Sequence, residues 1–387
     1  MSRKIIHYNI DNILKQGANI NLIWGERSNG KSYQVKHKMA VEPYLFGYDS
    51  FNDLYYNKGE IIKSSISAGK RFMLVRRFKE EITSSWIESY FSDVNIEKLT
   101  DGVYNMITMY RKELFLTFYD IETHKSKRGE KIGYAIALST EQNYAGGSYL
   151  DVTNIIFEEF MSRSSYLHDE SNKLLNLYST IDRKRGIVKM WLVGNTITRV
   201  CPYIQDWNLT HIIRNQKQGD INCLWIPTGD RDEKGHFIEV KLAIEHCKST
   251  GASSYVIGTH ADMLNRGAWQ SDPQPKLIKS YKEYKVLYRF GFCYKSFKWL
   301  CEYLLDPETK DVLWFIYPYN KEFKKDLIVF SDIIKQSPYW QTDIYNPLLR
   351  NKTICELFKT FRENRIFYSS DLCGTEFKQS IDFEIRR

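Results

Sequence analysis

The first two hundred residues predict an α/β fold in which helices cover both faces of a largely parallel sheet. Apolar runs of strand length alternate along this stretch with segments whose apolar residues recur at helical spacing. The first strand runs directly into a glycine-rich loop, and helix-compatible residues follow that loop. Strands that alternate with helices are typical of parallel sheets.

Each element rests on its own apolar pattern. Strands are expected at residues 19–24, 71–77, 154–160 and 188–194, and helices at residues 32–40, 78–91 and 169–184. Residues 106–119 and 132–138 are rich in β-branched and aromatic side chains and predict a hairpin. Between them, residues 122–131 are polar and basic and predict an exposed tip.

The length of 387 residues favours a large and a small domain. We expect the α/β domain at 1–205, a linker or lid subdomain at 206–270 and a strand-rich domain at 271–387. In the linker range, dipeptides that contain glycine, at 219–220, 229–230 and 234–235, interrupt the apolar pattern. In the strand-rich domain, residues 284–292, 295–303 and 312–317 predict strands, and residues 351–364 predict a helix.

The composition excludes several classes of protein. With 43% hydrophobic and 15% aromatic residues the chain is no disordered tail, and its net charge of +8 suits a polyanionic partner without demanding one. The seven cysteines contain no C-x-x-C pair, so we expect reduced thiols. The first twelve residues contain no apolar stretch of signal-peptide length, and no window of the sequence approaches 18 uninterrupted apolar residues. These features predict a cytoplasmic protein with no membrane partner.

A Walker A motif, the phosphate loop (P-loop) of NTPases, follows the first strand. Its glycines permit a tight turn whose N–H groups point at phosphate oxygens, the lysine reaches the β- and γ-phosphates, and the serine hydroxyl is a magnesium ligand. ATP and Mg²⁺ are therefore the expected cofactors; the alternative is a glycine turn that binds no nucleotide. The expected binding residues are Gly25, Glu26, Arg27, Ser28, Asn29, Gly30, Lys31, Ser32 and Tyr33.

Two acids end the strand at 154–160, as in a Walker B motif. We expect Glu158 at the magnesium through water and Glu159 as the carboxylate that polarises the attacking water. The alternative is an ordinary strand followed by an exposed acidic turn. Arg183 follows a helix and is either a finger offered in trans to a neighbour's ATP or a solvated helix end. Asn195, at the end of the next strand, is the expected γ-phosphate sensor.

Together these residues resemble the DNA-packaging ATPase (encapsidation protein) of small protein-primed tailed phages, the phi-twenty-nine group, which is related to terminase large subunits. The likeness covers roughly residues 1–205, with a faint echo at 355–359. Its segments, in order, are residues 25–33, 75–79, 137–139, 155–160 and 174–177, then Arg183, then 194–195 and 202–203. One departure is visible, because the first acid of the pair is usually Asp in that family and here is Glu158.

The resemblance implies a bacteriophage molecular motor of the catalytic-glutamate (ASCE) class of P-loop NTPases. Such a motor forms a homo-oligomeric ring, commonly a pentamer, in the host cytoplasm and transiently at the portal vertex of a prohead. It contacts the portal (connector) protein, in some cases through an RNA adaptor, and pumps double-stranded DNA inward. The roles implied are catalysis for Lys31 and Glu159, an arginine in trans for Arg183, and coupling of hydrolysis to motion for Asn195.

The resemblance also implies an RNase H-like fold for residues 271–387. In terminases the first strand of that domain carries a metal-binding acid, whereas here it carries Lys285 and Arg289, so we expect an inactive nuclease. The basic, aromatic stretch from 276 to 298 predicts contacts with phosphates or, alternatively, a solvated edge. The DNA-contact candidates are Lys79, Lys282, Lys285 and Lys295.

Two other functions stay open at this stage. A full terminase large subunit would use Glu302 and Asp306 to cleave DNA, together with Asp326 or Asp332. A non-motor protein would bind nucleotide only to order a structural scaffold.

Overall fold

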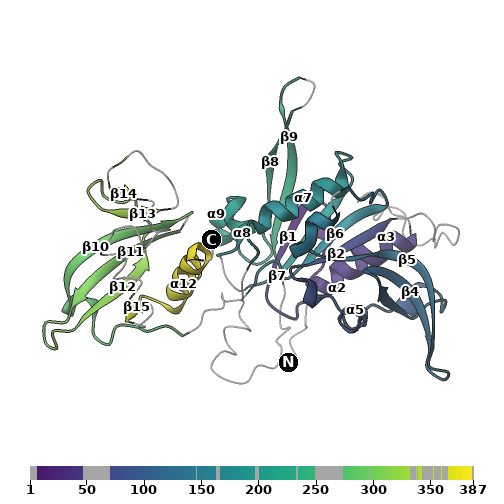
Figure 1. The fold of residues 1–387 in the computed structure, drawn as a ribbon, viewed down its shortest axis with the longest axis horizontal. Coiled ribbons are helices and arrows are strands. Elements are labelled where there is room, and N and C mark those ends of the chain that lie inside the picture. The colour runs from purple at the N-terminus through teal and green to yellow at the C-terminus, as the bar shows by residue number, and fades with distance from the viewer. Residues whose placement is uncertain are drawn as a thin grey trace. The chain divides into compact units, whose positions relative to one another are not determined.

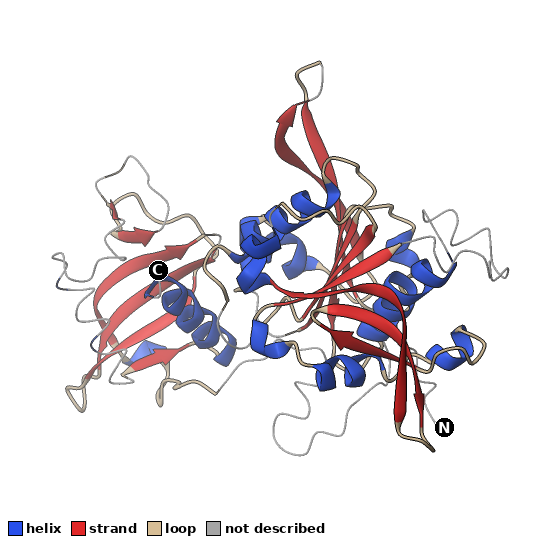
Figure 2. Cartoon of the chain, turned by 45° about the vertical axis from the view of Figure 1, so that its right-hand side comes forward, coloured by secondary structure: helices blue, strands red, loops and turns tan. Residues whose placement is uncertain are grey.

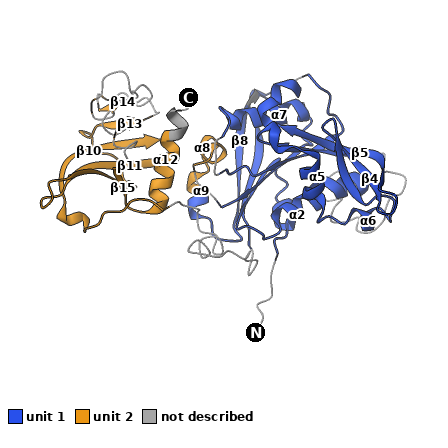
Figure 3. Ribbon diagram, turned by 60° about the horizontal axis from the view of Figure 1, so that its bottom comes forward, with its two compact units in different colours: residues 1–196, 212–268 blue, residues 197–211, 269–387 orange. Residues whose placement is uncertain are grey.

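The structure is a computed structural model, and its residues form two compact units. It describes residues 7–46, 70–144, 146–162, 166–196, 200–231, 234–248, 273–295, 297–331, 339–341 and 365–385, and residues 337, 352 and 359 singly. The first unit comprises residues 1–196 and 212–268, and the second comprises residues 197–211 and 269–387 (Figure 3). No helix within these described ranges is long and apolar enough to cross a membrane.

The described residues of the first unit form a nine-stranded sheet in the order β3-β4-β5-β2-β6-β7-β1-β9-β8. From β5 to β9 neighbouring strands run parallel, and the pairs β3–β4, β4–β5 and β8–β9 run antiparallel. This confirms the predicted α/β class. The strands are β1 (Ile20–Gly25), β2 (Arg71–Arg76), β3 (Met106–Tyr110), β4 (Glu113–Asp120), β5 (Lys125–Ala137), β6 (Val152–Glu158), β7 (Lys189–Asn195), β8 (Ile221–Arg231) and β9 (Phe237–His246).

Helices lie on both faces of the parallel strands (Figure 1). One core joins Ile23, Leu74 and Ile156 of the strands to the helical run that follows β1 and to α5 (Ser84–Phe91). That run consists of α2 (Lys31–Val35), a π-helical turn η1 (Lys36–Val41) and α3 (Glu42–Phe46). Because side chains alternate along a strand, the neighbouring apolar residues face the other side, where α7 (Glu170–Asp182) packs against β6.

Shorter helices connect these elements. They are α1 (Asp11–Leu14), η2 (Lys79–Glu81), α6 (Ile96–Leu99), η3 (Leu138–Tyr144), α8 (Pro202–Asp206) and α9 (Thr210–Asn215). The helix expected at 78–91 is divided, because Ile82 has an extended backbone and Thr83 starts α5 anew. The Thr83 side chain accepts a hydrogen bond from the Trp86 backbone N–H at 3.1 Å, which is an N-cap.

Two stretches expected to be irregular are strands. Residues 125–131, expected as a loop tip, belong to β5, so the exposed tip is only the turn at 121–124. Inside the range expected to be a linker or lid, β8 and β9 extend the large sheet. The turn signals at 229–230 and 234–235 lie at the ends of these two strands, where a hairpin turns.

In the second unit the described residues form a mixed six-stranded sheet with the order β14-β13-β10-β11-β12-β15. The helix α12 (Asp371–Ile385), which the sequence analysis missed, joins the core of this sheet through Phe377 and Ile381. The helix expected at 351–364 and the echo at 355–359 lie outside the described residues, apart from 352 and 359. The strands are β10 (Lys285–Tyr294), β11 (Phe297–Leu305), β12 (Val312–Pro318), β13 (Val329–Ser331), β14 (Trp340–Gln341) and β15 (Ile366–Tyr368).

A buried ion pair joins the end of β2 to the start of α7. Arg77 is 4% exposed and Glu170 is 1% exposed, and the guanidinium Nε and Nη2 donate to the carboxylate at 2.8 to 3.0 Å. Arg77 Nη2 also donates to the Phe160 carbonyl at 3.0 Å. A guanidinium that makes all these contacts fixes three chain segments relative to one another.

We predict that Arg77→Met destabilises the protein by about 3–5 kcal/mol, because it leaves a buried carboxylate without its cation. Urea unfolding measures this change. The double variant Arg77→Met/Glu170→Met should recover part of the loss, since it removes the unpaired charge as well. A single-variant cost comparable to that of a surface substitution would contradict the prediction.

Candidate functional site

The loop between β1 and α2 has a backbone that requires its glycines. Gly30 has a φ of 91°, in the left-handed region that side chains with a Cβ rarely adopt. At Gly25 the φ is 150°, and a Cβ there would lie 3.2 Å from the Cys247 Cβ. Both glycines of the motif therefore serve the local fold directly.

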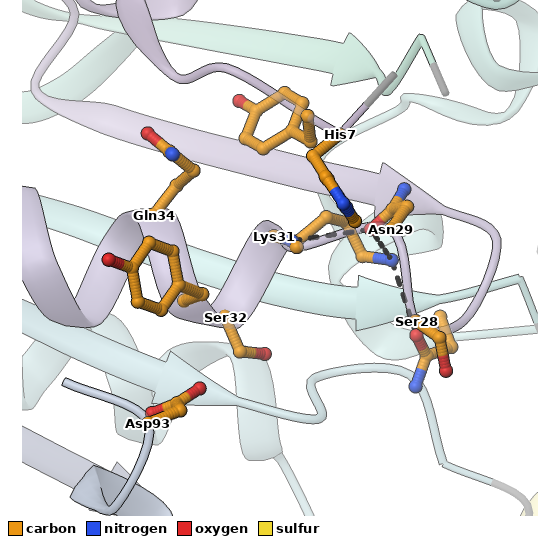
Figure 4. A pocket seen from close by; sticks show the side chains of 11 residues that line it. His7, Ser28, Asn29, Lys31, Ser32, Gln34 and Asp93 are labelled. Carbon is orange, nitrogen blue, oxygen red and sulfur yellow. Dashed lines mark hydrogen bonds between the residues drawn. The ribbon is translucent and has the colours of Figure 1, made fainter. Parts of the chain in front are cut away.

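Lys31 points back into this loop from the first turn of α2. Its ammonium donates to Asn29 Oδ1 at 3.1 Å and to Asn195 Oδ1 at 3.3 Å (Figure 4). It also donates to the Gly25 carbonyl at 3.3 Å and to the Glu26 carbonyl. Burial lowers the pKa of this ammonium, although the nearby Glu158 and Glu26 carboxylates oppose the shift. Lys31 is thus a buried cation that is held by neutral oxygens.

A pocket of about 650 Å³ opens beside Lys31. It is lined by the loop, by the first turn of α2 and by four residues from elsewhere in the chain: His7, Tyr8, Asp93 and Asn195. Asn195 reaches the pocket because β7 pairs with β1 in a register that sets it beside Gly25. Tyr33 also lines the pocket and is 37% exposed.

Glu158 and Glu159 have different surroundings at the end of β6. Glu158 is buried and accepts hydrogen bonds from the Ser32 hydroxyl at 3.0 Å and the Tyr90 hydroxyl at 2.7 Å. Burial raises the pKa of the Glu158 carboxyl, and these two hydrogen bonds oppose the shift. Glu159 is exposed, has a φ of 58°, and its carboxylate lies 3.0 Å from Arg76 Nη2.

Four predicted residues therefore converge: Lys31, Ser32, Glu158 and Asn195. Arg183 does not join them. It ends α7 in a left-handed conformation, and its Nη2 donates to the Gly147 carbonyl at 2.6 Å. Its guanidinium is exposed and does not line the pocket described above.

The predicted DNA contacts differ in their pairing. Lys79 is exposed in η2, and Lys282 and Lys285 are exposed at the start of the second unit's sheet. Lys295 instead pairs with Asp206. Other lysines of the same stretch are also paired with carboxylates, namely Lys276 with Asp371, Lys279 with Asp306 and Glu308, and Lys298 with Glu322.

The sequence analysis missed several groups around the site. Tyr90 was expected only as an apolar helix residue, and the pattern gave no sign of its hydroxyl contact. Arg76 and Arg77 were noted only within the similar segments, although two arginines directly after a buried strand are a usable signal. Tyr8 precedes the first strand expected and carried no signal.

Tyr8 connects the loop to a buried carboxyl on β9. Its backbone N–H donates to the Asn29 carbonyl at 2.8 Å, and its hydroxyl donates to Glu245 Oε2 at 2.7 Å. Burial raises the pKa of Glu245 to about 7, and the Tyr8 hydrogen bond limits that rise. A second pocket, of about 430 Å³, is lined by both residues.

Comparison with known protein families finds a match to this chain. Residues 2–222 match the family described as Podovirus DNA encapsidation protein (Gp16). The chain belongs to this family. Lys31, Ser32, Glu158 and Asn195 all lie within the matched range, which ends in β8.

Individual relatives of this chain are also recognisable. It is 30% identical over 209 residues to proteins named DNA packaging protein from Bacillus phage PZA and Bacillus phage phi29. Each alignment covers 53% of this chain and 51% of the relative, so the chain spans about half the length of the curated relatives it matches.

A solved structure shares the fold over almost the whole chain. A chain of the bacteriophage Phi-29 viral genome packaging motor assembly superposes with a TM-score of 0.53 at 19% identity, covering 98% of the present chain and 99% of the chain from the assembly. The likeness therefore extends to the second unit, which lies largely beyond the family match.

We predict that Glu245→Gln raises the free energy of unfolding at about pH 8 by on the order of 3 kcal/mol relative to the wild type. The folded carboxyl keeps its proton to about pH 7, whereas the unfolded one loses it near its ordinary value of 4.5. The wild type therefore loses stability relative to the variant as the pH rises through this window. Urea unfolding at about pH 5 and about pH 8 tests this, with Glu80→Gln as the exposed control. An equal difference at both pH values would contradict it.

Proposed function

We propose that this chain is the ATP-hydrolysing subunit of a motor that packages double-stranded DNA into a viral prohead. The convergence of Lys31, Ser32, Glu158 and Asn195 at one edge of the parallel sheet carries the proposal. Family membership supports the packaging role, because the relatives from phages PZA and phi29 are named DNA packaging proteins.

The first unit would act as a P-loop NTPase domain, with Walker A at residues 25–33. The residues present fit a nucleotide, since the buried Lys31 ammonium contacts only neutral oxygens, which phosphate oxygens of ATP would replace with charged ones. Loop N–H groups and the start of the following helical run favour anionic phosphates. The Lys31 ammonium, which donates to Asn195 Oδ1, would also bind the phosphates. Asn195 would therefore respond to the presence of the γ-phosphate and transmit that change to β7.

The donor set around Ser32 also fits Mg²⁺. The hydroxyl of Ser32 would bind the ion directly and Glu158 would bind it through water, and the two side chains lie 3.0 Å apart. When bound, the ion supplies neutralisation of charge on the phosphates. Tyr90 orients Glu158 by its hydrogen bond, so this carboxylate is held before the cofactor arrives. With Glu158 in place of the family's usual Asp, the carboxylate accepts the Ser32 hydrogen bond at 3.0 Å.

Glu159 would act as the base that orients and deprotonates the attacking water. It shares a strand end with Glu158, and its exposed carboxylate is held only at one side, by Arg76. A carboxylate in this position could reach a water at the γ-phosphate while Glu158 remains in place.

Arg183 would serve the ATP of a neighbouring copy in a homo-oligomeric ring, which we propose to be a pentamer. Support comes from its exposed position at the end of α7, away from its own pocket. Such a ring would work in the host cytoplasm, on the portal (connector) protein at the prohead vertex, with or without an RNA adaptor.

The second unit would have an RNase H-like fold without nuclease activity. Its Glu302 carboxylate is 1% exposed, accepts a hydrogen bond from Tyr281 at 2.5 Å and lies 3.5 Å from Arg289. Asp306 is held by Lys279 and by backbone N–H groups of its turn. Both carboxylates are thus engaged within the unit, which favours the motor over the nuclease alternative. Asp332 lies outside the described residues.

We expect duplex DNA to stimulate ATP turnover by the wild type. Lys31→Ala should abolish turnover, and Glu159→Gln should lower kcat by about 10²–10⁴-fold while leaving ATP binding intact, since only the base is lost. Glu80→Gln, which removes another exposed carboxylate, is the matched control. ATP turnover that does not change when DNA is added would contradict the proposed motor function. Turnover that is unchanged by Glu159→Gln would instead support a scaffold that nucleotide binding orders.

We also predict that Lys31→Ala and Arg183→Ala, each inactive alone, regain part of the wild-type turnover when mixed. In a mixed ring an intact Lys31 pocket can lie beside an intact Arg183 from the neighbour. Steady-state ATP hydrolysis across mixing ratios measures this. No recovery at any ratio, in rings shown to exchange subunits, would place the arginine's action within its own subunit.

A further inference from the structure

The hairpin formed by β4 and β5 extends from the large sheet as a two-stranded ribbon (Figure 2). On β4, pairing with β3 ends at Thr117, and on β5, pairing with β2 begins only at Gly133. Residues 118–120 and 125–127 therefore have each other as strand partners. The Asn105 side chain ties this part to the sheet, because it donates to the Tyr119 carbonyl at 2.7 Å and accepts from the Tyr119 N–H at 2.8 Å. We call this part, with the turn at 121–124 and the adjacent Arg128, the β4–β5 ribbon.

The turn that closes the ribbon is ordered by its own side chains. The Asp120 carboxylate accepts hydrogen bonds from the backbone N–H groups of Glu122 and Thr123, at 2.9 and 3.2 Å, and from the Thr123 hydroxyl at 2.7 Å. These contacts lower the pKa of this carboxyl, the Thr123 hydroxyl foremost. The ribbon is therefore a built element with a defined end.

Three exposed cations follow the turn: Lys125, Lys127 and Arg128. None of them is ion-paired with any residue that the structure describes. The register sets Lys127 opposite Phe118 and Arg128 opposite Thr117, so the two lysines lie on one face of the ribbon and the arginine lies on the other.

Arg128 is positioned by aromatic rings. Its guanidinium carbon lies 4.2 Å from the centroid of the Tyr110 ring and 5.1 Å from that of Phe115. Stacking of this kind orients the guanidinium plane and leaves its N–H edge available to a ligand oxygen.

The acids nearby leave these cations unneutralised. Glu113 pairs with Lys131, Glu130 accepts a hydrogen bond from Tyr44, and the Asp120 carboxylate is used by its turn. Glu122 is exposed at the turn itself. In the second unit, by contrast, the lysines at 276, 279, 295 and 298 are all paired with carboxylates. The ribbon therefore carries three exposed cations that no described carboxylate pairs with, although Lys79, Lys282 and Lys285 are exposed elsewhere.

We propose that the β4–β5 ribbon enters the major groove of double-stranded DNA, with Lys125 and Lys127 toward the phosphates on one side and Arg128 toward those on the other. A major groove about 12 Å wide admits a two-stranded ribbon, and phosphates line both of its edges. The major groove of duplex RNA is too deep and narrow for this, which favours DNA. The proposal rests on the proposed function only for the presence of duplex DNA.

The test is equilibrium binding of a fluorescent DNA duplex to the full chain, followed by anisotropy across salt concentrations. Lys125→Ser/Lys127→Ser should weaken binding about tenfold at moderate salt and lower the slope of log K against log salt by about 2, because two phosphate contacts are lost. Lys276→Ser/Lys298→Ser removes the same charge from paired lysines and should change affinity less than about twofold. Arg128→Gln should also weaken binding.

Several results would overturn the proposal. Equal losses in the two lysine variants would mean that only net charge matters. A larger loss for an RNA duplex than for DNA would assign the ribbon to RNA. Unchanged DNA binding together with new self-association would mean that the lysines only protect the ribbon from pairing with another strand.

Failure of the ribbon and failure of the motor give different results. If the ribbon variants bind DNA as tightly as the wild type does, only the ribbon proposal is wrong. If the wild type neither binds duplex DNA nor shows DNA-stimulated turnover, the proposed motor function itself is wrong. ATP turnover without DNA should be the same in the ribbon variants and the second-unit control, since none of the substituted residues lines the Lys31 pocket.

Discussion

The buried pair between Arg77 and Glu170 is the interaction on which the arrangement of the site depends. One guanidinium satisfies a carboxylate at the start of α7 and the carbonyl of Phe160 just after the acidic strand end. It therefore fixes the ends of β2 and β6 together with a helix from the opposite face. Such a pair is costly to bury, and its geometry compensates for that cost only when every contact is made. The positions of the strand ends around the site therefore depend on the complete set of Arg77 contacts.

Parallel pairing then accounts for most of the chemistry. Because β1, β6 and β7 run the same way, their carboxyl ends meet at one edge, and the loop, the two acids and Asn195 become neighbours without any long-range design. The left-handed backbone at Glu159 separates the roles of the acidic pair, since it turns the second carboxylate out toward Arg76 while the first stays buried. Two adjacent residues of identical chemistry thus occupy different environments.

Sequence patterns predicted β1, β6 and β7, which carry continuous apolar runs, and α7, whose apolar residues recur at helical spacing. They failed where tertiary pairing overrides local composition. The polar run at 125–131 is a strand because β4 supplies its hydrogen bonds, and β8 and β9 add to the sheet although turn signals surround them. The Tyr90 and Tyr8 hydroxyl contacts bridge residues far apart in sequence, so no local pattern could indicate them. For the same reason, local patterns could not indicate the ion pairs between lysines and carboxylates of the second unit.

The length of β5 has a mechanical consequence. This single strand of 13 residues begins at the ribbon and ends beside β2, next to the arginines at the acidic strand end. A pull on the ribbon along the strand axis would load the hydrogen bonds between β2 and β5 in shear, across all five register pairs at once, rather than peeling them one by one. Shear is the stiffer geometry, so β5 is suited to transmit tension between the tip of the ribbon and the edge of the sheet that holds the site.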